Sequence, residues 1–145
     1  MTTLSTVRPG DTVRISTDSA TEPFWQAAKG RRLVCAKCAQ CGHFRMPPTA
    51  FCPECSSPDV EWPELSGEGV VYSFAVIHGY PGIPDIVMVA AVIDLPDAPG
   101  CRLVSNIVDV DPDTVKIGMP VHVDFSPIAD GWQLPVFRAV VEDPA

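Results

Sequence analysis

The sequence lacks any long apolar run. No stretch of its 145 residues reaches the length of a transmembrane helix, and residues 1–8 are too polar to include the apolar segment of a signal peptide. We therefore expect a chain that is not secreted and does not bind a membrane. Its six cysteines suit a reducing compartment, and we expect the protein in the cytoplasm.

Histidine is scarce, and its placement does not indicate catalysis. His43, His78 and His122 are scattered along the chain, and no Ser–His–Asp order is accompanied by a motif. Cys101 stands beside Arg102, and we expect a buried or idle thiol there rather than a nucleophile. We expect no catalysis by this chain on its own.

Basic residues are few and unevenly spread. The chain has 10 Lys and Arg against 18 Asp and Glu, and the part from Pro63 to the end has twelve acids and three bases. This acidic part repels phosphate backbones, so we expect no nucleic-acid partner. Between Pro23 and Pro53 there is no acid. The five bases of this window could meet a small anion or an acidic partner surface; they are Lys29, Arg31, Arg32, Lys37 and Arg45.

Two Cys-x-x-Cys pairs, Cys38–Cys41 and Cys52–Cys55, are separated by ten residues. A tight turn over two residues points both sulfurs of a pair at one centre, and two such turns supply the tetrahedral thiolates of a structural zinc site. Gly42 fits the turn, because the residue after the second cysteine often needs a positive φ. The spacing predicts a bound metal. Two disulfides are the alternative, which an intracellular-looking chain disfavours.

The sequence allows more than one choice of metal ligands and of metal. Cys35 lies three residues before Cys38, so Cys35 and Cys38 could form the first pair. Gly42 favours Cys38 and Cys41, and we expect Cys35 to be a buried, inert thiol. His43 is a conceivable ligand, but four cysteines already fill the shell. We favour zinc over iron, although a rubredoxin-type iron site takes the same four thiolates.

The pattern predicts three parts: a flexible arm over 1–20, a helix plus zinc ribbon over 21–63, and a barrel over 64–145. In the arm, residues 12–15 could form a strand. The expected helix spans 21–29, with Ser19 or Thr21 as its cap and Gly30 at its end.

The third part is rich in β-branched and aromatic residues, and it contains one expected helical turn near 111–115. We expect a mainly β protein whose last part is a five-stranded closed barrel of the OB type. Pro135 argues that the last strand lies at an edge or begins at Val136. The expected strands are 70–78, 86–95, 101–108, 119–125 and 134–141.

The residues from about 22 to 141 resemble a known family, the OB-fold proteins with a rubredoxin-like zinc ribbon that accompany acyl-CoA enzymes and were long catalogued as a domain of unknown function. The matching motifs occur in order along the chain. They are Pro23-Phe24-Trp25, Cys38-x-x-Cys41-Gly42, Pro47-Pro48, Cys52-Pro53-x-Cys55, Trp62, Ser66-Gly67-x-Gly69-x-Val71-Tyr72-Ser73-Phe74, Val76-Ile77-His78, Ser105-x-Ile107-Val108 and Ile117-Gly118-Met119-Pro120-Val121.

This resemblance implies a non-catalytic accessory subunit in a hetero-oligomer with a thiolase-like enzyme, or in some cases a hydratase. Such complexes make or break carbon–carbon bonds of acyl-CoA thioesters by Claisen or retro-aldol chemistry. The accessory chain helps to line the substrate channel and supports assembly. This chain departs from the commonest form of the family in its arm, which has no clear leading helices. The alternatives are a single-stranded nucleic-acid-binding OB protein and a free-standing acyl-CoA-binding protein.

Two sets of residues are candidates for contact with acyl-CoA or with the partner. The loop between Gly79 and Asp85 follows His78 and holds two prolines, and loops on rigid barrels commonly make contacts. An ordinary strand connection is the alternative for this loop. The phosphates of CoA could instead meet the basic window. The candidate residues are Lys29, Arg31, Arg32, Arg45, His78, Tyr80 and Ile83.

Overall fold

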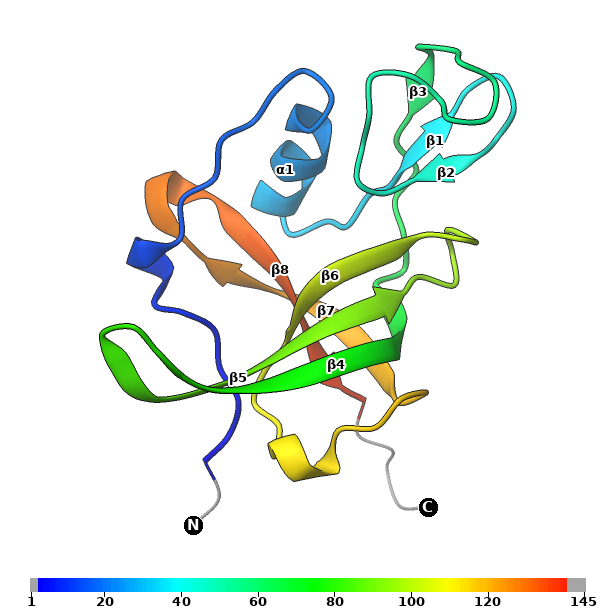
Figure 1. The fold of residues 1–145 in the computed structure, drawn as a ribbon. Coiled ribbons are helices and arrows are strands. Elements are labelled where there is room, and N and C mark those ends of the chain that lie inside the picture. The colour runs from blue at the N-terminus through cyan, green and yellow to red at the C-terminus, as the bar shows by residue number, and fades with distance from the viewer. Residues whose placement is uncertain (1–2, 141–145) are drawn as a thin grey trace.

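The computed structural model describes residues 3–140 of the chain. Figure 1 shows a barrel, with a helix and a small ribbon of short strands lying over one end of it. The helix, α1, spans Glu22–Lys29, and every other long element is a strand. The expectation of a mainly β protein with one short helix is therefore confirmed.

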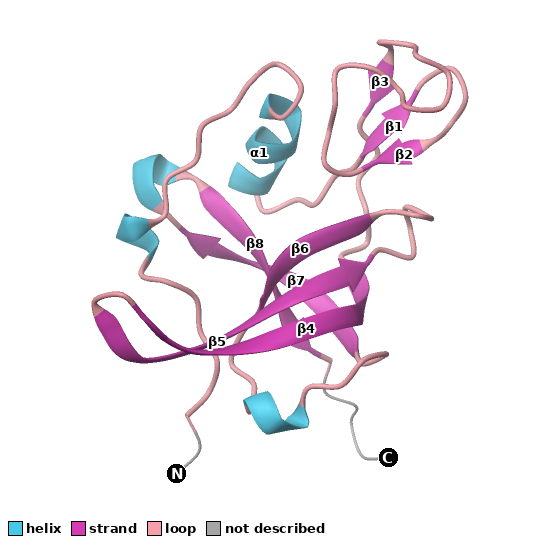
Figure 2. Cartoon of the chain, in the orientation of Figure 1, coloured by secondary structure: helices cyan, strands magenta, loops and turns pink. Residues whose placement is uncertain are grey.

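Five strands close the barrel in the order β4-β5-β6-β8-β7, with β7 returning to β4. All neighbouring pairs are antiparallel except β6 and β8, which meet in parallel where Ile107 pairs with Phe137. This is the five-stranded OB arrangement, and Figure 2 shows its strands wrapping around a common interior. The strands are β4 (Glu68–Tyr80), β5 (Ile83–Asp94), β6 (Arg102–Ile107), β7 (Pro120–Pro127) and β8 (Gln133–Ala139).

The barrel core forms because inward-facing apolar residues alternate with outward-facing ones along each strand. Several of these side chains are at most 1% exposed; they are Val71, Val89, Ile93, Ile107, Val121 and Phe137. Gly69 faces the same interior. A Cβ there would overlap Ile93 Cγ2 and lie 3.2 Å from Phe137 Cε2, so only a glycine fits.

The hairpin of β4 and β5 is longer than the sequence predicts. Residues 79–85, expected as a loop, are mostly strand, and Tyr80 pairs with Ile83 across the turn residues Pro81 and Gly82. Gly82 has φ +84°, the conformation that a type II turn requires after proline. The contact candidates His78, Tyr80 and Ile83 therefore lie on the β4–β5 hairpin and not in a loop.

The last strand contains Pro135, as the sequence indicated. Pro135 pairs with Phe125 of β7, and on its other side β8 reaches β6 only at Phe137. Both expected explanations for Pro135 are therefore wrong, because β8 has a neighbour on each side in the closed barrel and begins at Gln133. The proline is tolerated there because β8 pairs with β6 only at Phe137, so Pro135 interrupts no ladder with β6. The expected end of this strand at Val141 lies outside the described residues.

The expected helix is present, but its cap differs from the prediction. Thr21 occupies the N-cap position without a side-chain cap bond, and Ser19 does not cap either. Asp18 Oδ1 instead accepts the backbone N–H groups of Ala20 and Thr21. Gly30 ends the helix as expected. The apolar face of α1 joins the barrel core through three buried residues, Phe24, Ala27 and Ala28.

The described part of the N-terminal arm lies against the barrel. Ser5 is 1% exposed; its hydroxyl donates to Ile107 O at 2.8 Å, and its N–H donates to Val110 O at 2.9 Å. Residues 12–15 form no strand. Gly10–Thr12 is a 3-10 turn, η1, and the N–H of Ala129 donates to Val13 O. The boundaries proposed at residues 20 and 63 stay predictions.

Two further 3-10 turns connect the barrel strands. The turn η2 (Pro112–Thr114) confirms the helical turn expected near 111–115, and Asp111 caps it by accepting the N–H of Asp113. The turn η3 (Ala129–Gly131) joins β7 to β8. Within residues 3–140 no helix is both long enough and apolar enough to cross a membrane.

The ribbon is a three-stranded antiparallel sheet in the order β2-β1-β3. Its strands are β1 (Ala36–Cys38), β2 (Phe44–Arg45) and β3 (Val60–Glu61). Backbone bonds tie the base of the ribbon together just above the barrel, because Leu65 N donates to Leu33 O and Cys35 N donates to Pro63 O. Phe51, between the two cysteine pairs, is 61% exposed and does not cover the ribbon.

Candidate metal centre

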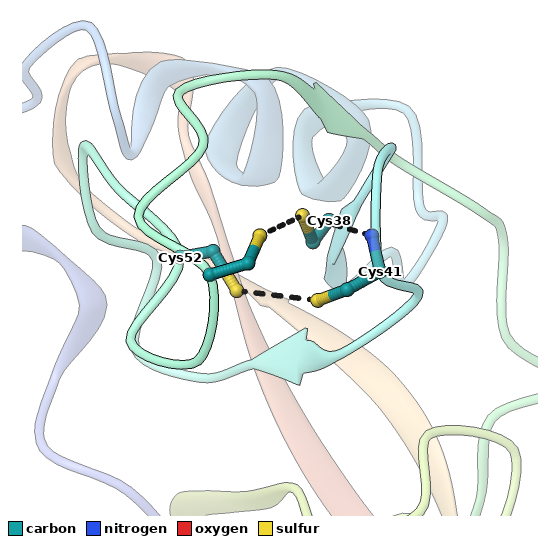
Figure 3. Close-up of side chains that lie close together, drawn as sticks. Cys38, Cys41 and Cys52 are labelled. Atoms are coloured by element: carbon teal, nitrogen blue, oxygen red, sulfur yellow. Dashed lines mark hydrogen bonds between the residues drawn. The ribbon is translucent and has the colours of Figure 1, made fainter.

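Four cysteine sulfurs converge at the tip of the ribbon. The Sγ atoms of Cys38, Cys41, Cys52 and Cys55 all lie within 4.8 Å of one another. Figure 3 shows the side chains of Cys38, Cys41 and Cys52 pointing into the space between the two turns that carry them. The predicted set of four is therefore brought together by the fold.

The spacing of the sulfurs fits a tetrahedral metal. Cys38 Sγ lies 3.5 Å from Cys55 Sγ, and Cys41 Sγ lies 3.6 Å from Cys52 Sγ. A zinc–sulfur bond of about 2.3 Å gives a tetrahedron whose edges measure about 3.8 Å. An all-thiolate donor set of this size suits a structural metal, with no open position for substrate.

The backbone prepares one of these sulfurs to be a thiolate. The N–H of Cys41 points at Cys38 Sγ at 3.5 Å and the N–H of Gln40 at 3.4 Å. The hydrogen bond from Cys41 is the main reason that the pKa of Cys38 falls to about 6. Gly42 has φ +79°, as the turn was expected to require.

Cys35 lies outside this group. Its side chain is fully buried, and its Sγ is 3.8 Å from Cys101 Sγ, at the junction of the ribbon and the barrel. Burial raises the pKa of Cys35 to about 12, so the thiol stays protonated. His43 is exposed on the ribbon and does not join the four sulfurs. The structure thus favours Cys38 over Cys35 as the start of the first pair.

The basic window is not a cluster of free charges. Arg31 Nη2 lies 2.8 Å from Asp124 Oδ1 on β7, and Arg32 Nη1 lies 3.4 Å from Glu64 Oε1. The acids that pair with these bases therefore come from outside the window. Lys29 and Lys37 instead lie over the rings of Trp132 and Phe44.

Asp124 joins the segment after α1 to the barrel, a role that sequence reasoning missed. It accepts from Arg31 and, at 2.6 Å, from Arg138 Nε on β8, and Arg138 also pairs with Asp109. The bond from Arg138 is the main cause of the lowered pKa of Asp124. No local motif signals this network, because its partners are far apart in the sequence.

Comparisons with known proteins match both parts of the chain. A family model described as "ChsH2, rubredoxin-like zinc ribbon domain" matches residues 25–61, and one described as "ChsH2, C-terminal OB-fold domain" matches residues 62–126. The ribbon and the barrel are thus each recognised as a separate unit, in the order in which the structure places them.

Relatives come from bacteria and archaea. A "Probable enoyl-CoA hydratase alpha subunit" of Thermomonospora curvata is 45% identical over 121 residues; the match covers 81% of this chain but only 37% of that protein. A "DUF35 domain-containing scaffold protein" of Methanothermobacter thermautotrophicus is 36% identical over 101 residues, covering 68% of this chain and 74% of that protein. This chain therefore spans a little over a third of the length of the first relative.

A solved structure matches more completely. One chain of the "Ltp2-ChsH2(DUF35) aldolase" superposes with a TM-score of 0.80 at 38% sequence identity. The match covers 88% of this chain and all of that chain. The ribbon and barrel described above therefore correspond to the whole length of the matched chain.

Proposed function

This chain belongs to the ChsH2 family of DUF35 proteins, and from that premise we propose that it is a non-catalytic accessory subunit of an enzyme complex that acts on acyl-CoA thioesters. In this proposal its metal is zinc, held by Cys38, Cys41, Cys52 and Cys55 as a structural staple. In this proposal the complex makes or breaks carbon–carbon bonds by Claisen or retro-aldol chemistry.

The match to the aldolase chain is the observation that carries this proposal. Its name places a ChsH2(DUF35) chain in an aldolase together with a second component, Ltp2, and this chain covers the whole of the matched chain. The name of the relative from Thermomonospora curvata also describes that protein as a subunit. A chain of this fold is thus named as one part of a larger enzyme.

The side chains of the described residues support a non-catalytic role. Over residues 3–140, none of the side chains of His43, His78 and His122 is hydrogen-bonded to a carboxylate, a hydroxyl or a thiol. Burial is the main cause of the raised pKa of both Cys35 and Cys101, which keeps these thiols protonated and poor as nucleophiles. The four remaining cysteines are committed to the metal centre.

We propose a thiolase-fold subunit as the partner, with a hydratase as the second choice. The β4–β5 hairpin is the proposed contact, because it extends past the barrel in Figure 1 and carries His78, Tyr80 and Ile83. Ile77 on the same hairpin is 39% exposed. The exposed parts of Lys29, Arg31 and Arg32 are a second proposed contact, with either acyl-CoA phosphates or the partner.

Co-expression with a thiolase-fold protein from the same organism tests the proposal. We expect a stable hetero-oligomer by size-exclusion chromatography and native mass spectrometry. Replacing both Tyr80 and Ile83 with glycine is expected to weaken assembly. As a matched control, Ile117→Gly removes an apolar residue that is 70% exposed in the β6–β7 connection and is expected to assemble normally. Two proteins that elute separately would contradict the proposed role.

A cytoplasmic location completes the proposal. None of the six cysteines forms a disulfide, and four of the sulfurs converge in the arrangement of a thiolate metal site, which a reducing environment favours. Zinc analysis of protein purified from the native host without added reductant tests this. Recovery of disulfide-bonded protein without metal would argue against the location.

A further inference from the structure

One arginine of the ribbon is buried without an acid. Arg45, the last residue of β2, is only 5% exposed. Within residues 3–140 no carboxylate oxygen lies within 4.0 Å of its guanidinium. The five arginines that do pair with carboxylates have side chains that are 47–71% exposed; they are Arg14, Arg31, Arg32, Arg102 and Arg138.

This distribution is the reverse of what electrostatics favours. A charge removed from water needs a counter-charge more than an exposed one does, because the lost hydration is not replaced. Arg45 Nε donates to Thr49 O at 3.2 Å, and Nη1 is enclosed by protein without a hydrogen-bond partner among the described residues, so Nη2 is the nitrogen left to meet a ligand. None of the four metal-centre sulfurs bonds to the guanidinium in this part of the chain either.

A cavity lies beside this side chain. It has a volume of about 220 Å³ and lies between the loop before α1 and the ribbon. This space holds several water molecules and is large enough for a molecule with one six-membered ring. Its walls include Ser19, Pro23, Arg45, Thr49, Val60 and Trp62.

The walls determine what the cavity can take. The guanidinium carries the charge that a carboxylate or a phosphate requires, and the hydroxyl of Ser19 offers a further donor, whereas the hydroxyl of Thr49 already donates to Phe51 O. Pro23, Val60 and the indole of Trp62 supply apolar surface for the rest of a ligand. We propose that this cavity binds a small organic anion, through a carboxylate or phosphate on Arg45, with an apolar or aromatic body against Trp62.

This site is distinct from the metal centre and from the hairpin contact, and it requires no partner subunit. It also differs from the basic window as a whole, because Arg31 and Arg32 are already paired with Asp124 and Glu64. Failure of the accessory role therefore would not remove the site, and failure of the site would not remove the accessory role.

Calorimetric titration of the metal-loaded full chain tests the proposal with three probes: phenyl phosphate, benzoate and inorganic phosphate. Chloride replaces the probe at constant ionic strength as the control. We expect phenyl phosphate or benzoate to bind once per chain. The stronger of the two identifies the charged group, and weaker binding of inorganic phosphate shows the contribution of the apolar walls. Binding is also expected to change the tryptophan fluorescence, and Trp62→Phe is expected to abolish that change because Trp62 lines the cavity.

Two variants place the binding at this cavity. Arg45→Met keeps the aliphatic part of the side chain, and it is expected to weaken binding by at least about tenfold because one charge-assisted contact is lost. Ala50→Phe fills the cavity from an exposed wall position and leaves Arg45 in place, so it decides the question even where Arg45→Met does not fold. Arg102→Met, at an exposed arginine on the barrel, is the control and is expected to bind normally.

Two results would overturn the proposal. The first is no binding of any probe at about 10 mM, where a ligand with a Kd near 1 mM is almost saturated. The second is equal binding by wild type and by Ala50→Phe, which would place the anion on the general protein surface.

Discussion

Removal of the metal is expected to unfold the ribbon while the barrel stays folded. In the described structure, residues 36–61 bury only three apolar side chains, Ala36, Cys38 and Cys52, and two of these are ligands. The barrel has a continuous core with large side chains such as Ile93 and Phe137 and does not depend on the metal. The ribbon therefore has little besides the metal to hold it together.

The size of the expected loss follows from comparing the free energy that the metal contributes with that of the buried side chains. Structural zinc contributes about 10–16 kcal/mol in peptides of this size at pH 7. Burial of three small side chains contributes only about 1 kcal/mol each, at about 0.8 kcal/mol per methylene. The total free energy of unfolding of a small domain is only about 5–15 kcal/mol, so the rest of the ribbon cannot compensate for loss of the metal. We therefore expect complete loss of the ribbon and not partial loosening.

Nuclear magnetic resonance of the ¹⁵N-labelled chain provides the assay, before and after treatment with excess chelator. Ribbon amides over 36–61 are expected to collapse to random-coil shifts, while those of β4–β8 remain dispersed. Cys52→Ser should reproduce this result without chelator. Glu54 is exposed and lies between the ligands Cys52 and Cys55, so Glu54→Ala is the matched control and should keep one metal per chain. Dispersed ribbon amides in protein proven metal-free, or simultaneous unfolding of the barrel, would refute the reasoning.

Three further predictions concern the barrel and its junction with the ribbon. Gly69→Ala forces a methyl group against Ile93 and should lower the free energy of unfolding by about 1–3 kcal/mol in urea denaturation; an unchanged midpoint would mean that the core can relax. Asp124→Asn should cost about 1 kcal/mol at pH 7, because the ion pairs are partly exposed. The folded pKa of Asp124 is lowered, so the loss should shrink as the pH falls below about 4, and a cost that does not vary with pH would contradict this. Cys35 and Cys101 should react with a thiol reagent only in denaturant, since they are at most 4% exposed; rapid labelling of the native, metal-loaded chain would contradict their burial.

The sequence predicted the features that local chemistry dictates. The four ligands were identifiable because a metal requires a fixed spacing within each pair, and the structure brings those sulfurs together. The five strands and their closure into a barrel followed from β-branched stretches and turn signals in a chain of this length.

The features that were missed depend on tertiary contacts. The cap was assigned to Ser19 or Thr21 by position, but Asp18 reaches the backbone N–H groups of that turn. The basic window appeared uncompensated because Asp124, which pairs with Arg31, is 93 residues away. The burial of Arg45 has no signal in its neighbours, since the cavity beside it is built from three separate segments.

The central claim is that this chain serves the active site of another subunit. Steady-state turnover of an acyl-CoA thioester by the thiolase-fold partner alone, by this chain alone and by the purified complex tests it most directly. The account predicts no turnover by this chain alone and a higher kcat/KM for the complex than for the partner. Turnover by this chain alone at an enzyme's rate, about 1 s⁻¹ or more, would contradict the account.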